Sequence, residues 1–238
     1  MNIDDDKVYF EQEIALEPYL VPSEIKRLYI HRTIHMVTNP LPDSLMDGIQ
    51  YAGYEQTATL KDLNPNATLS EMWNLVQLNA GGTLMIPCIG KVSSTDYFGN
   101  VPDEARTVNG NHLRIPITGR QQFKVGYKSA CMTGRLGYRH MLADGREYLL
   151  VRCFFNNPSN IYAEEPPLLE GNTGHSVHVY NDGGEFGGQN SFGEMESSGH
   201  TIGGRTGRTT TTDSFILWAY IGTSTAIQRA AQILLGTI

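Results

Sequence analysis

The sequence has few cysteines and lacks the short motifs that mark several common enzyme classes. Its 238 residues include three cysteines, Cys88, Cys131 and Cys153, which are widely spaced and form no CxxC pair. A zinc site and a disulfide framework are therefore not expected, and the three are predicted to be buried thiols. No Gly-x-Ser-x-Gly, His-Glu-x-x-His or dinucleotide-binding fingerprint occurs, so hydrolase, zinc-protease and NAD-dependent functions have no support, and no cofactor is expected.

The chain also lacks a long apolar run and an excess of basic residues. No stretch approaches the ~20 apolar residues needed to cross a bilayer, so no membrane association is expected. The formal charge of -7 leaves no basic stripe for phosphates, which argues against a nucleic-acid partner and fits a neutral or weakly polar ligand. The acidic start, MNIDDDKVYF, has no apolar h-region, so no signal peptide is expected. A cytoplasmic location follows by default, or a periplasmic or secreted one if a signal has been removed.

What the sequence does contain is a series of strand-length segments separated by turns. Residues 28–37 alternate with period two, and GTLMIPCIG, HLRIPITG, QQFKVGY, EYLLVRCFF and HSVHVYN are bounded by Gly, Asn, Asp or Pro. The Asp-Gly of ADGRE predicts a hairpin. Residues 224–236, STAIQRAAQILLG, predict a helix, and residues 69–78 predict either a short helix or another strand. We expect an all-β protein with a short C-terminal helix: residues 1–238 as a single domain, with residues 1–27 as a loosely packed N-terminal extension.

Two glutamates stand two residues apart in the segment SFGEMES. On a strand, Glu194 and Glu196 point the same way with Cα atoms about 6.6 Å apart, while Met195 faces the core. Neighbouring carboxylates raise the pKa of one of the two, and such a pair can divide acid and base roles or bind a polyol through its hydroxyls. The alternative interpretation is an edge strand that carries two solvated acids.

The residues before this strand are small and polar. Tyr180, Asn181 and Asp182, in YNDGG, are candidate substrate-binding residues because the backbone there can approach a ligand closely. STDYFGNVPDE is expected to be a loop whose Tyr97 is exposed for stacking on a sugar, or a loop anchored by buried aromatic rings.

Cations and histidines supply the remaining candidates. Arg120 and Lys124 are predicted to share a face, where a cation could steady a sugar carboxylate or pair with Glu194, unless both remain solvated. His178 and His200 are nearest in sequence to the glutamates and are the candidate acids, because the pKa of histidine lies near neutrality; the alternative is that they are ordinary surface or core residues. His175 and His178 are expected on opposite faces of a strand, which disfavours a metal site.

Several motifs together resemble an uncharacterised family of galactose-mutarotase-like domains. They are TLMIPCIG…TDYFGNVPDE, ITGRQQFKVGYKS and YNDG…FGEMESSG, and the shared order runs from about residue 28 to AAQILLG. The resemblance implies a β-supersandwich of antiparallel strands whose concave face holds carbohydrate. In such enzymes one strand glutamate acts as general base on the anomeric hydroxyl, and the matching position here is Glu196.

The sequence also departs from the mutarotase pattern. Pro40, in MVTNPLPD, stands where the family carries a histidine, and the upstream His-Gly-Gly motif has no counterpart. Two functions therefore stay open: acid–base catalysis at a sugar's anomeric centre with Glu196 as base and His178 or His200 as acid, or non-catalytic carbohydrate binding or assembly. A sugar or glycan is the expected partner in both. A third alternative is a homo-oligomer in which an exposed sheet edge pairs with another copy.

Overall fold

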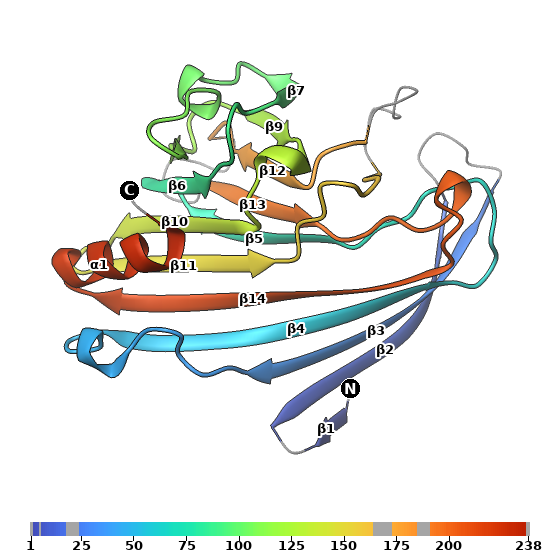
Figure 1. The fold of residues 1–238 in the computed structure, drawn as a ribbon, viewed down its shortest axis with the longest axis horizontal. Coiled ribbons are helices and arrows are strands. Elements are labelled where there is room, and N and C mark those ends of the chain that lie inside the picture. Colours follow the sequence, from blue (N-terminus) through green and yellow to red (C-terminus); the bar gives the residue numbers. More distant parts are fainter. Residues whose placement is uncertain (1, 5, 18–23, 164–172, 185–190, 237–238) are drawn as a thin grey trace.

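The part of the chain that the structure describes folds into two antiparallel β-sheets and one C-terminal helix, as the sequence predicted. The computed structural model describes residues 2–4, 6–17, 24–163, 173–184 and 191–236. The nine-stranded sheet has the order β1-β2-β3-β4-β14-β11-β10-β6-β8, and the five-stranded sheet has the order β5-β13-β12-β9-β7 (Figure 1).

The strands of the nine-stranded sheet are β1 (Asn2–Asp4), β2 (Lys7–Leu16), β3 (Lys26–Met36), β4 (Gln50–Asp62), β6 (Gly82–Pro87), β8 (His112–Ile117), β10 (Arg135–Met141), β11 (Glu147–Phe154) and β14 (Thr210–Gly222). Those of the five-stranded sheet are β5 (Trp73–Asn79), β7 (Ser94–Gly99), β9 (Phe123–Tyr127), β12 (Val177–Asn181) and β13 (Phe192–Ser198). The helix α1 spans Ser224–Leu235, and short 3₁₀ turns occupy Asp43–Leu45, Asp103–Ala105, Ser129–Cys131 and Gly204–Thr206.

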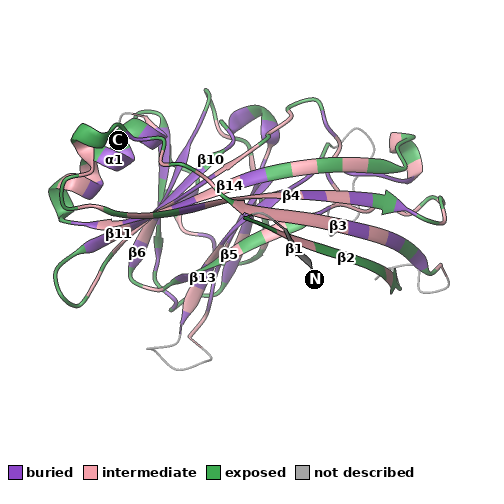
Figure 2. Cartoon of the chain, turned by 90° about the horizontal axis from the view of Figure 1, so that it is seen from below, coloured by how far each residue is buried: buried purple, intermediate pink, exposed green. Residues whose placement is uncertain are grey.

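The main core lies between the two sheets. Side chains alternate along each strand, so Leu84 and Ile115 of the nine-stranded sheet meet Val125, Val179 and Met195 of the five-stranded sheet, all of them fully buried. Figure 2 shows the buried residues gathered where the sheets overlap. The opposite face of each sheet is therefore left for helix packing, loops or ligands.

Helix α1 covers part of the outer face of the nine-stranded sheet. Its stripe of Ile227, Ala230, Ala231, Leu234 and Leu235 is buried against β10, β11 and β14, which is the spacing that the sequence indicated. Thr223 caps its start by accepting a hydrogen bond from the backbone of Ala226, and Gly236 ends it with φ of 92°. Among the described residues, no helix has the length and apolar character of a membrane span.

A further cluster lies under the long strands β3 and β4. Leu28, Ile30 and Leu60 pack there with Met72 and Ile202 from the connecting segments. A buried ion pair closes this end of the sheet, because Lys26 Nζ lies 2.6 Å from Asp62 Oδ2.

Several expectations change or are resolved. Residues 73–79 form a strand, which decides between the two structures predicted for this segment. Asp96–Phe98 lie on β7 instead of in a loop, with an irregularity in the pairing with β9 between Asp96 and Phe98. The three cysteines are free; Cys88 and Cys131 are buried and Cys153 is half-buried, and burial raises the pKa of the Cys88 thiol to about 11.

Candidate functional site

The outer face of the five-stranded sheet carries a dense group of polar side chains. Met195 faces the core with no exposed surface, so Glu194 and Glu196 face outward, as the alternation predicted. The register places His178 opposite Glu196 and Tyr180 opposite Glu194. Strand β13 lies between β5 and β12, so the edge-strand interpretation is wrong. We refer to the residues that gather here as the Glu196 cluster: Trp73, Tyr97, Lys124, His175, His178 and Glu196.

The carboxylate of Glu196 is completely buried and holds two partners on one oxygen. Trp73 donates its indole N–H to Oε2 over 2.8 Å, and the Lys124 ammonium lies 3.0 Å from the same atom. The Glu196 side chain is 0% exposed and that of Lys124 is 20% exposed. The other oxygen, Oε1, is buried and has no hydrogen-bond partner among the described residues. A buried oxygen of this kind is costly to leave unmatched, so Oε1 would gain from accepting a hydrogen bond, but the side chain has no exposed surface at which a ligand could supply one.

Trp73 combines a fixed position with an exposed ring. Its residue surface is 55% exposed, although its N–H is tied to the buried carboxylate. The Lys124 ammonium lies 4.9 Å from the centroid of the same ring, within cation–π distance. The indole is therefore held by two contacts and still presents apolar surface to solvent.

The two histidines of the cluster meet at Tyr97. The Tyr97 hydroxyl lies 3.2 Å from His175 Nδ1 and 3.2 Å from His178 Nε2, and the imidazole rings are 6.1 Å apart. The expectation that these histidines point to opposite faces is wrong, because β12 begins at Val177 and strand alternation does not extend back to His175. Gly126 makes room for all three rings, since a Cβ there would lie 2.8 to 3.0 Å from atoms of Tyr97, His175 and His178.

Burial decides the protonation of His178. Desolvation, followed by the positive charge of Lys124 and the proximity of His175, lowers the pKa of His178 to about 3. The imidazole is therefore neutral near pH 7. It can donate or accept a hydrogen bond, but it is not a protonated imidazolium that could act as an acid. Burial and the nearby Glu196 raise the pKa of Glu194 from its usual range, the second being the like-charge effect that the sequence suggested.

The other predicted substrate-binding residues have varied environments. Tyr180 lies on the outer face, where its hydroxyl accepts from Gln122 over 3.2 Å. Asn181 is buried, and its side-chain oxygen accepts the backbone N–H groups of Thr118 and Gly119 at the turn after β8.

Asp182 and Arg120 lie near the same turn. Asp182 is 2% exposed, and its carboxylate accepts from the Tyr180 hydroxyl and the backbone of Gly184. Arg120 is exposed. Asn181 thus stabilises the loop between β8 and β9, whereas Asp182 stabilises the turn that follows β12, and both side chains are occupied by those contacts.

His200 lies apart from the Glu196 cluster. It follows β13, contacts Asp213 of β14 through Nδ1, and stacks on Phe155 with ring centroids 5.5 Å apart. No described contact joins it to Glu196. Among the residues that the structure describes, no group of three His, Cys, Asp or Glu side chains is arranged to hold a metal ion.

The contacts that two members of the cluster, Trp73 and Lys124, make with Glu196 were not predicted from the sequence. Trp73 comes from a segment whose structure was left open, and its partner Glu196 lies 123 residues away. Arg120 and Lys124 were predicted to share a strand face, with an ion pair to Glu194 as one of the alternatives; the structure pairs Lys124 with Glu196, and Arg120 precedes β9.

Comparison with known proteins gives a fold likeness. No family model and no curated protein matches the chain. Among solved structures, it is similar to the crystal structure of a protein from Escherichia coli K12 described as a putative aldose 1-epimerase, with 10% identity and a TM-score of 0.43. The match covers 92% of this chain and 67% of that one. At this identity and TM-score, nothing about the fold or function of this chain is concluded from the likeness.

Proposed function

We propose that this protein binds a carbohydrate on the outer face of the five-stranded sheet, with Trp73 as the stacking surface. The observation that carries the proposal is the half-exposed indole whose N–H is fixed by the fully buried Glu196. Sugars present apolar C–H faces that pack on aromatic rings, and a ring held in place before binding loses little conformational freedom when the ligand arrives.

Polar groups on the same face fit the hydroxyls of such a ligand. Glu194 and Gln77 lie side by side in the register of β13 and β5, and Lys124 comes from β9 two strands away. Ligand sites of this kind combine an apolar surface with a few fixed polar groups that set orientation. In this function Glu196 is a positioning residue, since its carboxylate holds Trp73 and Lys124.

A second candidate function is acid–base catalysis at the anomeric centre, and the unpartnered Oε1 of Glu196 favours it. In that reaction Glu196 takes the proton of the anomeric hydroxyl, the bond from C1 to the ring oxygen breaks, and the ring oxygen receives a proton. Lys124 is the charged donor in contact with Glu196, whereas His178 is neutral and acts only through hydrogen bonds. When the ring closes again on the opposite face of C1, both proton transfers run in reverse. Because the Glu196 side chain has no exposed surface, a ligand can reach Oε1 only if neighbouring side chains move.

Fluorescence and anomer interconversion test the two functions separately. The chain has two tryptophans, and Trp218 is 8% exposed, so a Trp218→Phe background isolates the signal of Trp73. Titration with glucose, galactose and glucuronate should give a saturable change in Trp73 emission. By calorimetry, Trp73→Ala should abolish the binding, while Phe155→Ala, a control at a 64% exposed ring, should leave it intact. Binding of none of these sugars, or equal loss in both variants, would contradict the proposal.

Catalysis has its own measurement. If Glu196 is a base, the protein accelerates the approach of pure α-glucose or α-galactose to its anomeric equilibrium, followed by optical rotation, and Glu196→Gln abolishes the acceleration. Acceleration that survives in Glu196→Gln rules this mechanism out. Sugar binding without acceleration supports the binding function alone.

A further inference from the structure

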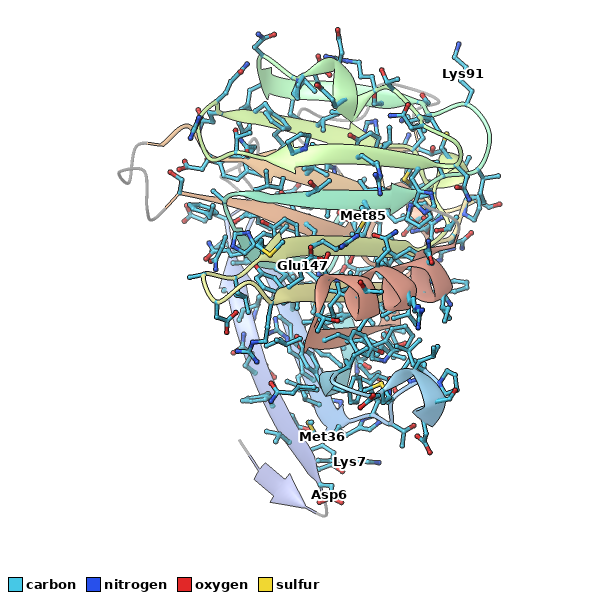
Figure 3. All side chains as sticks on the ribbon, turned by 90° about the vertical axis from the view of Figure 1, so that its left-hand side faces the viewer. Asp6, Lys7, Met36, Met85, Lys91 and Glu147 are labelled. Atoms are coloured by element: carbon cyan, nitrogen blue, oxygen red, sulfur yellow. The ribbon has the colours of Figure 1, made fainter. Side chains whose placement is uncertain are left out.

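A separate cavity opens on the outer face of the nine-stranded sheet, on the opposite side of the sandwich from the Glu196 cluster. Its volume is about 270 Å³, and the side chains that matter for its chemistry are Thr83, Met85, Arg114, Arg139, Met141 and Glu147. Met85 and Glu147 lie beside helix α1 when the molecule is viewed from that end (Figure 3).

The strand register explains why these side chains meet. Arg139 of β10 lies opposite Thr83 of β6, and Met85 lies opposite Arg114 of β8. All four point away from the core between the two sheets, because their neighbours Leu84, Leu113 and Tyr138 point into it.

Arg139 is held firmly at one side of the cavity. Its Nε lies 3.1 Å from Glu147 Oε2, its Nη2 contacts the same oxygen, and its Nη1 donates to Gln228 of helix α1. The second oxygen of Glu147 accepts the Ser224 hydroxyl over 2.9 Å. Both oxygens of this carboxylate are therefore occupied, and the pair forms a fixed wall with side chains only 18% and 10% exposed.

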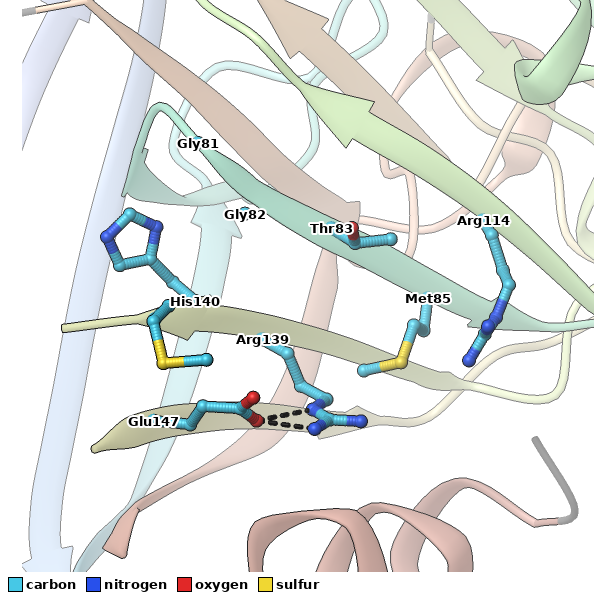
Figure 4. Close-up of a pocket in the computed structure, with 9 residues that line it drawn as sticks. Gly81, Gly82, Thr83, Met85, Arg114, Arg139, His140 and Glu147 are labelled. Atoms are coloured by element: carbon cyan, nitrogen blue, oxygen red, sulfur yellow. Dashed lines mark hydrogen bonds and ion pairs between the residues drawn. The ribbon is translucent and has the colours of Figure 1, made fainter. Parts of the chain in front are cut away.

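Arg114 reaches the same cavity without a partner. It lies on the edge strand β8, and no hydrogen bond or ion pair joins its guanidinium to any residue that the structure describes. Figure 4 shows its side chain directed from β8 toward the strand that carries Arg139. The cavity thus contains two guanidinium groups and one carboxylate, which is a local excess of positive charge in a protein whose formal charge is -7. A general surplus of basic residues does not account for it.

We propose that this cavity binds a small organic oxyanion, a carboxylate or a phosphate, with the charged group on Arg114. A guanidinium presents a planar fork of N–H donors that matches the oxygens of either group. The Thr83 hydroxyl supplies a further donor, and the exposed Met141 is an adaptable apolar surface for the body of the ligand, while Met85 lines the cavity as a buried residue. Pockets for drug-sized ligands have volumes of roughly 300–1,000 Å³, so the cavity suits a smaller molecule.

Calorimetric titration at fixed ionic strength tests the site with two probes, glycerol 3-phosphate and malate. We expect saturable binding of at least one probe, weakened about tenfold or more by Arg114→Gln because charge-assisted hydrogen bonds are lost. Arg27→Gln is the matched control, since Arg27 is exposed on distant β3 and its replacement changes the net charge equally. It should leave the affinity unchanged. The preferred probe identifies the oxyanion.

Two results would overturn the proposal: no saturable binding of either probe, or an equal loss of affinity in Arg114→Gln and Arg27→Gln, which would indicate attraction to net charge alone. Trp73→Ala tests whether the cavity acts independently of the site on the other face of the sandwich. It should not alter oxyanion binding, because the two sites lie on opposite outer faces.

Discussion

The ammonium of Lys124 lies 3.0 Å from Oε2 of Glu196, and the two groups form the charged centre of the outer face of the five-stranded sheet. The carboxylate has no exposed surface, so this ammonium supplies the compensating charge. The same ammonium lies over the ring of Trp73. One cation thus links the buried acid to the exposed aromatic surface.

Replacing Lys124 by Met should destabilise the protein by about 3–5 kcal/mol, because it leaves a buried carboxylate without its counter-charge. Urea unfolding measures the change. Lys91→Met is the control, since Lys91 projects into solvent (Figure 3) and its loss should change the free energy of unfolding by less than about 0.5 kcal/mol. Adding Glu196→Gln to Lys124→Met should restore part of the loss; no recovery would show that Lys124 acts through packing alone.

The lowered pKa of His178 predicts a dependence of stability on pH. The unfolded imidazole binds a proton below about pH 6.5, whereas the folded one does so only near about pH 3. Between these values the unfolded state holds more protons, so the free energy of unfolding falls as the pH falls, by up to about 1.4 kcal/mol per pH unit. His178→Phe should flatten this slope. In NMR titrations the His178 ring signals should stay constant between about pH 5 and 8, and a midpoint in that range would contradict the assignment.

Gly126→Ala should disturb the contact of Tyr97 with the two histidines. The added methyl group would lie within 3.0 Å of ring atoms from Tyr97, His175 and His178, so a loss of about 1–3 kcal/mol is expected from overpacking. Gly183→Ala is a milder control because its nearest contact is the Gln122 Cβ at 3.2 Å. Thermal unfolding compares the two variants, and equal melting temperatures would show that the rings move aside freely.

Replacement of Arg152 should not lower the stability of the protein, in contrast to the replacements of Lys124 and Gly126. The guanidinium of Arg152 is completely buried and stacks 4.0 Å from the Phe215 ring centroid, and burial lowers its pKa to about 10. Nη1 donates to the Asn74 carbonyl, whereas Nε and Nη2 have no hydrogen-bond partner among the described residues. Arg152→Met should therefore be neutral or stabilising, because it removes a buried charge that has no carboxylate. Leu149→Ala on the same strand should cost about 2–5 kcal/mol. A comparable loss in Arg152→Met would reveal an unrecognised partner.

Local sequence patterns predicted much of the architecture. Alternation placed Met195 in the core and Glu194 and Glu196 together on the outer face, and the Asp-Gly turn of ADGRE joins β10 and β11 as expected. The spacing of Ile227, Leu234 and Leu235 predicted helix α1 and its buried stripe. These features depend on residues close together in the chain, whose geometry follows from the periods of strand and helix.

The composition of the site was less predictable because it depends on pairing between distant strands. Lys124 lies opposite Tyr180, which lies opposite Glu194, so only the three-dimensional arrangement shows that its ammonium reaches the diagonal neighbour Glu196. Trp73 meets Glu196 because β5 pairs with β13, a register that no local motif encodes. His175 joins the cluster because the chain is not yet a strand at that position.

Strand β4 pairs along its length with β14, with Thr57 opposite Ser214, so the ladder joins two segments that are far apart in the chain. A ribosome must synthesise all the residues between these two strands before that pairing can form. Contacts of such long range slow folding, since the entropy of closing a large loop is lost before the ladder forms. Until β14 has been synthesised, the edge of β4 in the β3–β4 hairpin is unpaired. The length of this period should govern chaperone dependence and aggregation during expression.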